Sequence, residues 1–343
     1  MSELYARIYD FENLYQAANL AAKGKRYKPA VLRFFHQNLD EHLIEIQNEL
    51  IWKTYKLGDF YNFEVYEPKR RQISALPFKD RVVQIALCNI IEPFFDQRFI
   101  YDTYACRVGK GSVSAASRLS YFLQKPDATK YLKCDIHKYF HSVNIDRLEE
   151  IIQTRYIKDP EVMWLIDTIL RHDYHEDGIK IGNRLSQLVA NAYLAEVDFY
   201  LKVKRQIPYY IRYMDDFVIL GNSKLKLQKI KNEVEVFLEK HLLLKLNDKT
   251  KIDNCKNGID FVGYKVFPKN KIIKKSSMNR TLAVYRAWRK GKIDDERFLA
   301  SIGSRIGHAT GTASYMFYIK VILKALQWAL SPNRKNSGGA LLK

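Results

Sequence analysis

Apolar and polar residues alternate along this chain with two different periods. Apolar residues that recur every three or four positions predict amphipathic helices, and short apolar runs bounded by turn residues predict strands and hairpins. Helices are expected over residues 10–22, 29–52, 80–95 with an end near Pro93, 225–239 and 276–331. Two further helices are expected, one that begins near residue 146 and another that ends near residue 194. The strands and hairpins are expected over residues 60–78, 131–136, 209–220 and 261–267.

Two adjacent carboxylates occupy the tip of one predicted hairpin. The tetrapeptide Tyr213-Met214-Asp215-Asp216 lies between the apolar runs 209–211 and 217–220. Neighbouring acids in a buried turn repel each other unless a cation neutralises them, which favours a divalent metal site. A solvated turn is the alternative, because Asp is common in turns.

A third carboxylate, Asp135, ends the strand-like run that begins at Tyr131. Together with Asp215 and Asp216 it would make a cluster of three oxygen ligands, which suits two Mg²⁺ ions, with Mn²⁺ as a substitute. Two such ions held about 3.5–4 Å apart can activate a hydroxyl nucleophile and stabilise a leaving pyrophosphate. These three aspartates are therefore the candidate catalytic and metal-binding residues.

The order of the motifs resembles that of reverse transcriptases. A strand with Asp135 is followed by the helix entry Gly182-x-x-x-Ser186, by the Tyr-Met-Asp-Asp hairpin, by a helix and by the hairpin 261–267, while segments 66–73 and 78–84 resemble the family's fingers. The resemblance covers roughly residues 60–270, and several ordered motifs are more specific than any single one. It implies an α+β right-hand polymerase fold, with fingers, a palm of antiparallel sheet flanked by helices, and a small helical thumb.

The resemblance, together with the residue pattern and the composition, implies a division of the chain. The expected parts are a helical extension over 1–58, fingers with part of the palm over 59–130, a palm over 131–275, a helical thumb over 276–331 and a disordered tail over 332–343.

The helix entry distinguishes subfamilies. Many bacterial reverse transcriptases carry Gln-Gly-x-x-x-Ser-Pro here, whereas this chain has Ile181 in place of the Gln and Gln187 in place of the Pro. This variant is similar to the reverse transcriptases of diversity-generating retroelements. The resemblance implies copying of a template-repeat RNA into cDNA with errors at adenines, for transfer into a target gene, and an oligomeric accessory variability protein as a partner.

Ile181 lacks the hydrogen-bonding group that a Gln would have at this position. A Gln side chain there could hydrogen-bond the incoming nucleotide or the neighbouring backbone, a contribution of about 1 kcal/mol net. We hypothesise that Ile181 and Gln187 together relax discrimination at adenine. The alternative is that Ile181 is a packed aliphatic residue at a junction between a strand and a helix.

Other roles are carried over from the resemblance by position. Phe140 matches a steric gate against ribonucleotides, Ile136 offers only its backbone carbonyl to a metal, and Met214 matches a position under the primer end. Lys69 and Arg71 match cationic positions that contact the dNTP triphosphate, as charge-assisted hydrogen bonds require. Arg81 is a further candidate for template or triphosphate. The alternatives are a core aromatic for Phe140, packing within the turn for Met214 and a solvated surface for the cations.

Two further segments predict contacts with primer or template. Gly109, Lys110 and Gly111 fit a turn at a helix start where the backbone comes close to phosphates; Tyr104 stands where a phosphate-binding Walker loop would need Gly. Basic and apolar residues alternate beyond residue 276, which indicates a thumb that grips a duplex; a helical cap with a soluble face is the alternative. Its candidate contacts are Arg280, Arg286 and Arg289.

Composition agrees with a nucleic-acid partner. The chain has 57 Lys and Arg against 38 Asp and Glu, a formal net charge of +19. No apolar run approaches the length of a membrane span, and the beginning of the chain does not resemble a signal peptide. Four isolated cysteines favour a reducing compartment, and we expect the cytoplasm. The pairs His137 with His141 and His172 with His175 are expected to be surface residues rather than zinc ligands.

Three other functions remain open from the sequence. The chain could be the reverse transcriptase of a retron or a phage-defence system. It could be a non-catalytic RNA-binding palm protein, although three intact acids disfavour that class. A nucleotidyl cyclase with a related palm is the third, and the fingers-like motif and the positive charge disfavour it.

Overall fold

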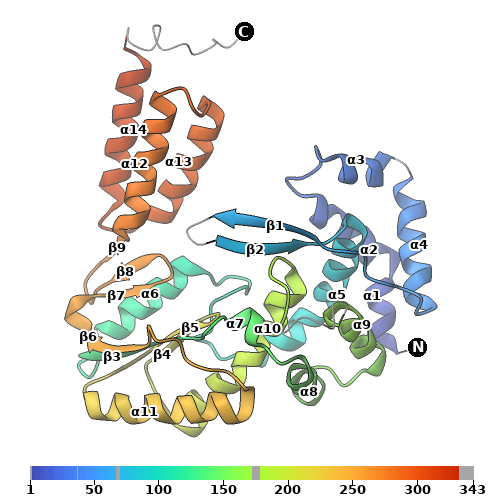
Figure 1. Ribbon diagram of the computed structural model, residues 1–343, viewed down its shortest axis with the longest axis horizontal. Coiled ribbons are helices and arrows are strands. Elements are labelled where there is room, and N and C mark those ends of the chain that lie inside the picture. The colour runs from blue at the N-terminus through green and yellow to red at the C-terminus, as the bar shows by residue number, and fades with distance from the viewer. Residues whose placement is uncertain (1, 37, 67–69, 172–177, 332–343) are drawn as a thin grey trace. The chain divides into compact units, whose positions relative to one another are not determined.

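The computed structural model describes residues 2–36, 38–66, 70–171 and 178–331 (Figure 1). It divides into two compact units that are each discontinuous in sequence. The first comprises residues 1–107, 134–208 and 230–250, and the second comprises residues 108–133, 209–229 and 251–343.

The first unit is largely helical, with one two-stranded hairpin. Its helices are α1 Glu3–Tyr9, α2 Phe11–Ala22, α3 Pro29–His36, α4 Leu39–Ile51, α5 Phe78–Asp96, α7 Tyr139–Ser142, α8 Ile145–Arg155, α9 Pro160–Leu170 and α10 Arg184–Phe199. Strands β1 Tyr61–Tyr66 and β2 Arg70–Ala75 pair antiparallel, with Tyr61 opposite Ala75. The core includes many apolar side chains that α5 and α10 bury, among them Val83, Leu87, Val189 and Leu194.

The second unit contains two sheets and a helical bundle. A four-stranded sheet has the order β4-β5-β3-β6, from β3 Lys130–Asp135, β4 Tyr210–Tyr213, β5 Asp216–Gly221 and β6 Lys251–Asn254. A three-stranded antiparallel sheet follows, from β7 Ile259–Phe261, β8 Tyr264–Val266 and β9 Lys271–Ile273. The helices are α6 Ser112–Leu123, α12 Lys275–Arg289, α13 Asp295–Ala309 and α14 Tyr315–Ala329. Helix α11 Lys224–Phe237 begins in this unit and ends in the first.

The segment after β9 forms the helical bundle that its pattern predicts. Figure 1 shows α12, α13 and α14 side by side. Trp288 of α12 stacks on Phe298 of α13 with ring centroids 4.3 Å apart, and Trp328 of α14 meets Trp288 edge-on at 4.8 Å. This aromatic core is large for three short helices, and aromatic rings contribute more buried area per residue than aliphatic side chains do.

Two expectations about helix ends were wrong. The segment 29–52 contains two helices, because Asn38 adopts a left-handed conformation (φ +62°) that a continuous helix does not allow. Helix α5 continues through Pro93 to Asp96, because the Pro93 carbonyl still accepts a bond from the Gln97 N–H and Phe95 is fully buried. Packing here outweighs the loss of one backbone donor.

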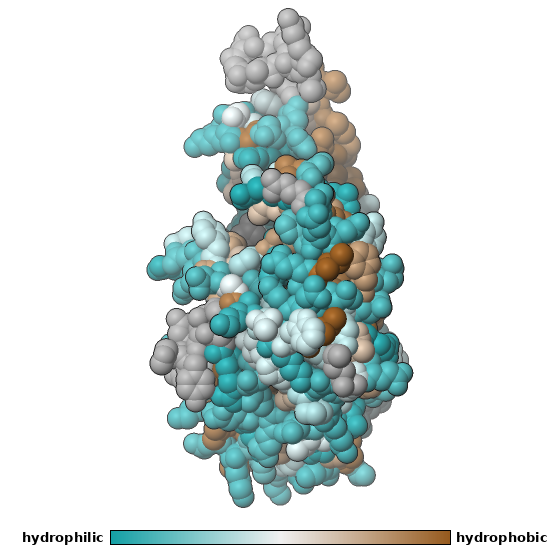
Figure 2. Space-filling model, turned by 90° about the vertical axis from the view of Figure 1, so that its right-hand side faces the viewer, coloured by the Kyte–Doolittle hydropathy of each residue, from teal (hydrophilic) through white to brown (hydrophobic). Residues whose placement is uncertain are grey.

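The surface agrees with the composition. The face shown in Figure 2 is mostly hydrophilic, with small separate hydrophobic patches. Across the described residues, no helix has both the length and the apolar character needed to cross a membrane. All four cysteines are free thiols, and three of them are buried.

Candidate active site

The predicted acidic hairpin is present in the second unit. Strands β4 and β5 pair with Tyr213 opposite Asp216, which leaves Met214 and Asp215 as the turn. Met214 takes a left-handed conformation (φ +55°), which costs a non-glycine residue energy and must be stabilised by its surroundings. Asp215 and Asp216 are half-buried, as the proposed metal ligands would need to be.

Arg212 provides the first stabilising contact of this turn. It lies on β4 with no exposed surface, among the buried side chains of Tyr210, Ile211 and Phe217. Its Nη1 donates a hydrogen bond of 3.0 Å to the carbonyl oxygen of Met214. A charge-assisted bond from a buried guanidinium fixes the turn in the conformation that presents the two acids.

Lys133 provides a second cation beside the acids. Strand β3 lies next to β5 in the sheet, and Lys133 Nζ donates to Asp216 Oδ2 at 2.8 Å and also to the Asp260 carbonyl oxygen. The side chains of Lys133 and Asp216 are 18% and 25% exposed, so this ion pair is partly screened by solvent. The pair neutralises one of the two neighbouring carboxylates.

Asp135 is the last residue of β3 and belongs to the first unit, whereas Asp215 and Asp216 belong to the second. Its carbonyl oxygen accepts a bond of 2.7 Å from the Asn247 N–H, and the next residue, Ile136, is buried and forms a β-bridge with Leu246. Within the described parts of the chain, no group of three or more His, Cys, Asp or Glu side chains is arranged to hold a metal.

The donor set itself fits a hard divalent cation. Asp215 and Asp216 offer only carboxylate oxygens, which Mg²⁺ prefers over nitrogen and sulfur ligands. One oxygen of Asp216 is engaged with Lys133, so a metal at this turn would share or displace that ammonium group.

The helix entry that distinguishes subfamilies is in the first unit, and it is bonded to the fingers-like hairpin. The Ile181 carbonyl accepts a hydrogen bond of 3.0 Å from the Ser74 N–H on β2. Gly182 has φ +124°, and a Cβ there would lie 2.9 Å from Ile73 Cγ2 and 3.2 Å from the Ser74 carbonyl oxygen. Only glycine allows this close approach. Residues more than 100 positions apart in sequence therefore lie side by side.

The structure also describes the other two motif residues of this helix entry, Ser186 and Gln187. The Asn183 side chain caps α10 by accepting from the Ser186 N–H at 2.7 Å, and Ser186 is buried. Gln187 is exposed, and its Oε1 accepts a hydrogen bond of 3.2 Å from the Cys106 thiol. Ile181 itself is half-buried.

Phe140 is held against the same loop region. It is half-buried on the short helix α7, and its carbonyl oxygen accepts a bond of 2.8 Å from the Ile179 N–H. A Cβ on Gly178 (φ +84°) would lie 2.3 Å from that oxygen. The backbone around Phe140 is therefore fixed by a contact that requires a glycine.

The predicted cations of the fingers are described in part. Lys69 lies outside the described residues, as do His172 and His175, and of Arg71 only the backbone in β2 is described. Arg81 is half-buried, with its guanidinium 5.2 Å from the Phe78 ring centroid and its Nε without a hydrogen-bond partner among the described residues. Burial lowers the pKa of Arg81, and burial together with the charge of Arg81 lowers the pKa of Lys25.

The remaining candidates occupy exposed or half-buried positions. Gly109 (φ +72°) and Gly111 (φ +123°) precede α6, and a Cβ on either would meet no atom within 4 Å, while Lys110 between them is half-buried. Arg280, Arg286 and Arg289 are exposed on α12. His137 and His141 are exposed, as expected for surface histidines.

Sequence reasoning missed Lys133 and Arg212, although both left a signal. Lys133 lies two residues before Asp135, and residues two apart in a strand share one face. Arg212 is a charged residue inside an apolar strand immediately before the acidic turn. A charge in a buried strand is rare unless it is paired, so its position beside two acids is informative.

This chain is similar to known proteins over the segment that contains these residues. A family model described as reverse transcriptase (RNA-dependent DNA polymerase) matches residues 66–266. Protein YkfC of Escherichia coli (strain K12) is 26% identical, with 60% of this chain and 66% of YkfC covered. The COX1/OXI3 intron 2 protein of Saccharomyces cerevisiae is 22% identical, with 55% of this chain and 29% of that protein covered. The chain thus spans less than two thirds of each of these relatives.

A solved structure has a similar fold. Telomerase from Candida tropicalis, in complex with a TWJ fragment of telomeric RNA, superposes with a TM-score of 0.53 at 12% sequence identity. The match covers 86% of this chain and 58% of the telomerase chain. The expected α+β polymerase fold is confirmed by this likeness and by the antiparallel sheets flanked by helices.

Proposed function

Because the chain belongs to the reverse transcriptase (RNA-dependent DNA polymerase) family, we propose that it copies an RNA template into DNA and that it serves a diversity-generating retroelement. The observation that carries the polymerase activity is the β4–β5 turn, where Asp215 and Asp216 are presented by a hairpin that Arg212 and Lys133 hold in place. A solvated surface turn has no need of a buried guanidinium beneath it.

Two Mg²⁺ ions would be held by the carboxylates of Asp135, Asp215 and Asp216, with the Ile136 carbonyl as a further ligand. When bound, they supply activation of the primer hydroxyl and stabilisation of the leaving pyrophosphate. The chain's own groups position the reactants. Arg212 fixes the acidic turn, Phe140 excludes a 2′-hydroxyl by contact, and Lys69, Arg71 and Arg81 bind phosphate oxygens. The unsatisfied Nε of half-buried Arg81 supports its role as an anion ligand.

The retroelement assignment rests on the loop from Ile181 to Gln187. The backbone bond between Ser74 and Ile181 joins this loop to the fingers hairpin, so a side chain at position 181 is carried next to the strand of Arg71. An aliphatic side chain there offers no hydrogen bond to the nascent pair. We propose that this lack of a polar contact, together with Gln187, lowers fidelity opposite template adenines.

The partners follow from the same proposal. They are a template-repeat RNA, a primer or cDNA strand, dNTPs and an oligomeric accessory protein that helps bind the RNA. The net charge of +19 supports the nucleic-acid partners, because phosphate binding is driven by cations. A retron or phage-defence reverse transcriptase is the competing function within the same class.

Sequencing of the cDNA tests the proposal. The purified chain is given Mg²⁺, four dNTPs and a primed RNA, with and without the accessory protein, and errors are counted by template base. We expect errors concentrated at adenines, a lower adenine error rate in Ile181→Gln, and no change in the matched aliphatic control Ile181→Val. Accurate cDNA from the unmodified chain, or an Ile181→Gln error rate equal to that of the control, would contradict the retroelement assignment.

A further inference from the structure

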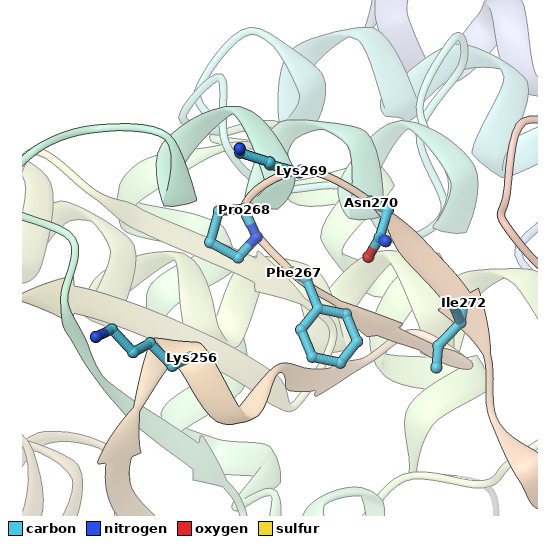
Figure 3. A pocket seen from close by; sticks show the side chains of 6 residues that line it. All are labelled: Lys256, Phe267, Pro268, Lys269, Asn270 and Ile272. Atoms are coloured by element: carbon cyan, nitrogen blue, oxygen red, sulfur yellow. The ribbon is translucent and has the colours of Figure 1, made fainter.

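A cavity of about 550 Å³ opens on the surface of the second unit, and none of its lining residues is among those proposed for catalysis. Its size falls in the range that small ligands occupy in proteins. It is lined by the β8–β9 turn, by the middle residue of β9 and by the short turn before β7, through Lys256, Phe267, Pro268, Lys269, Asn270 and Ile272 (Figure 3).

The cavity combines an aromatic floor with cationic and amide groups. In Figure 3 the Phe267 ring has Lys256 and Lys269 on one side and Asn270 and Ile272 on the other. Lys256, Lys269 and Asn270 are exposed, whereas Phe267 is half-buried and leaves part of its ring accessible. A third ammonium group, that of Lys265, lies 5.7 Å from the ring centroid.

The ring is held in place before any ligand arrives. Gly258 has φ +72°, and a Cβ there would lie 2.6 Å from the Phe267 ring, so the ring packs directly on glycine backbone. The Phe267 N–H donates to the Asn270 carbonyl oxygen at 2.8 Å and closes the turn. Lys271 Nζ donates to Ser117 Oγ at 2.8 Å, which ties this hairpin to α6. A fixed aromatic surface loses little conformational entropy on binding.

The rim retains its positive charge. The carboxylates of the neighbouring strands are paired elsewhere, since Asp253 lies 3.7 Å from Lys251 and Asp260 lies 3.9 Å from Lys274. Within the described residues, neither Lys256 nor Lys269 forms an ion pair. The site therefore presents ammonium groups to an anion above an apolar, planar floor.

We propose that this cavity, defined by Phe267, Lys256 and Lys269, binds an unpaired nucleotide of single-stranded RNA. The base stacks on the Phe267 ring, the flanking phosphates contact Lys256 and Lys269, and the Asn270 amide bonds to a base edge or ribose hydroxyl. Stacking on an aromatic ring beside a basic rim is how proteins hold single strands without reading sequence. RNA bound at this site would lie outside the segment that is being copied.

The test is RNA binding by the full chain without dNTPs or Mg²⁺, so that it does not depend on polymerase activity. A fluorescein-labelled, unstructured RNA of about eight nucleotides is titrated while an excess of unlabelled RNA–DNA primer–template occupies the polymerase cleft. Phe267→Leu, which keeps apolar volume, is compared with Phe267→Tyr, which keeps the ring. We expect about tenfold weaker binding for Leu and unchanged binding for Tyr.

The rim is tested by a matched pair of charge deletions. Lys256→Ala with Lys269→Ala is compared with Lys226→Ala with Lys229→Ala, which removes two exposed lysines of α11 in the same unit. We expect the first pair to reduce the salt slope of binding by about 1.4, at roughly 0.7 per phosphate on a single strand, and the second to leave it unchanged. Thermal unfolding of each variant checks that the fold is intact.

Each outcome decides the proposal. Equal weakening by the two lysine pairs, or equal affinities of the Leu and Tyr variants, would overturn it. Competition by polyglutamate as effective as that by unlabelled RNA would also overturn it, because the site would then bind acidic chains without a base. Should Phe267→Leu fail to fold, the lysine pairs and the Tyr variant still decide.

Discussion

Two hairpins of the second unit place charge in opposite ways. The β4–β5 hairpin carries two acids at its turn, where Lys133 pairs with Asp216 and the fully buried Arg212 donates to the Met214 carbonyl oxygen. The β8–β9 hairpin carries Lys269 at its turn, exposed and without a neutralising partner among the described residues. The acidic hairpin pairs Asp216 with a cation of the protein, whereas the basic hairpin leaves Lys269 exposed to a ligand.

The difference teaches how each hairpin should respond to its surroundings. Buried ion pairs and hydrogen bonds are weakly screened by salt, so the acidic turn should keep its geometry over a wide range of ionic strength. Exposed cations are strongly screened, and binding through them falls steeply with salt. Catalytic geometry and RNA retention are therefore expected to separate when salt is varied.

The largest expected effect comes from breaking the acidic hairpin at Arg212. Arg212→Leu removes a buried donor and leaves the Met214 carbonyl, and any other group that Arg212 contacts, unsatisfied. We expect a loss of about 3 kcal/mol in the free energy of unfolding, measured by urea denaturation. A loss below about 1 kcal/mol would show that the guanidinium is not needed beneath the turn.

The β8–β9 hairpin can also be disrupted, at the glycine against which its Phe267 ring packs. Gly258→Ala adds a Cβ at a position with positive φ, 2.6 Å from the Phe267 ring. We expect about 2 kcal/mol of destabilisation, since both the backbone strain and the displaced ring contribute. Gly109→Ala is the control, because it has a similar φ but open space around the added Cβ, so it should be less destabilising. Equal losses of unfolding free energy in Gly258→Ala and Gly109→Ala would contradict the claim that Gly258 holds the Phe267 ring in place.

Lys133→Met sharpens the comparison, because it removes the second cation from the acidic hairpin while keeping an unbranched side chain. The pair with Asp216 is partly exposed, so we expect less than about 1 kcal/mol in unfolding free energy. Half-maximal activity should require a different Mg²⁺ concentration, since Asp216 loses a competing cation, and Lys133→Arg should behave more like the unmodified chain. An unchanged Mg²⁺ titration in the Met variant would show that Lys133 does not act on Asp216.

The smallest expected effect is a pH dependence at the other end of β8. Tyr264 stacks on His308, and burial, with the charge of Lys271, lowers the pKa of His308. The unfolded chain then binds the proton more tightly, so this stability is present above about pH 6.5 and is lost as the pH falls. Between about pH 7.5 and 5.5 the melting temperature should fall less in His308→Gln than in the unmodified chain. Parallel curves for the two proteins would contradict this account.

The local parts of this comparison were predictable from sequence. The turn at Met214 and Asp215, the cap of α10 by Asn183 and the glycine turn before α6 all follow from patterns a few residues long. Such signals are strong because side-chain periodicity and capping depend on near neighbours.

The rest depends on contacts between distant residues. The bond from Ser74 to Ile181 and the pair of Lys133 with Asp216 join segments about 100 and 80 positions apart, which no local pattern encodes. Helix α5 passes Pro93 because of tertiary packing that propensity does not include. The sheet order β4-β5-β3-β6 likewise follows from the whole fold.

The most direct test of the central claim is primer extension on an RNA template. The unmodified chain is compared with Asp215→Asn, Asp216→Asn and the double variant, each isosteric with the residue it replaces, with Mg²⁺, four dNTPs and the accessory protein present. We predict cDNA from the unmodified chain and a loss of at least about a thousandfold in the double variant, because the carboxylate charge at the turn is gone. Equal cDNA yields from the unmodified chain and the double variant would contradict the account.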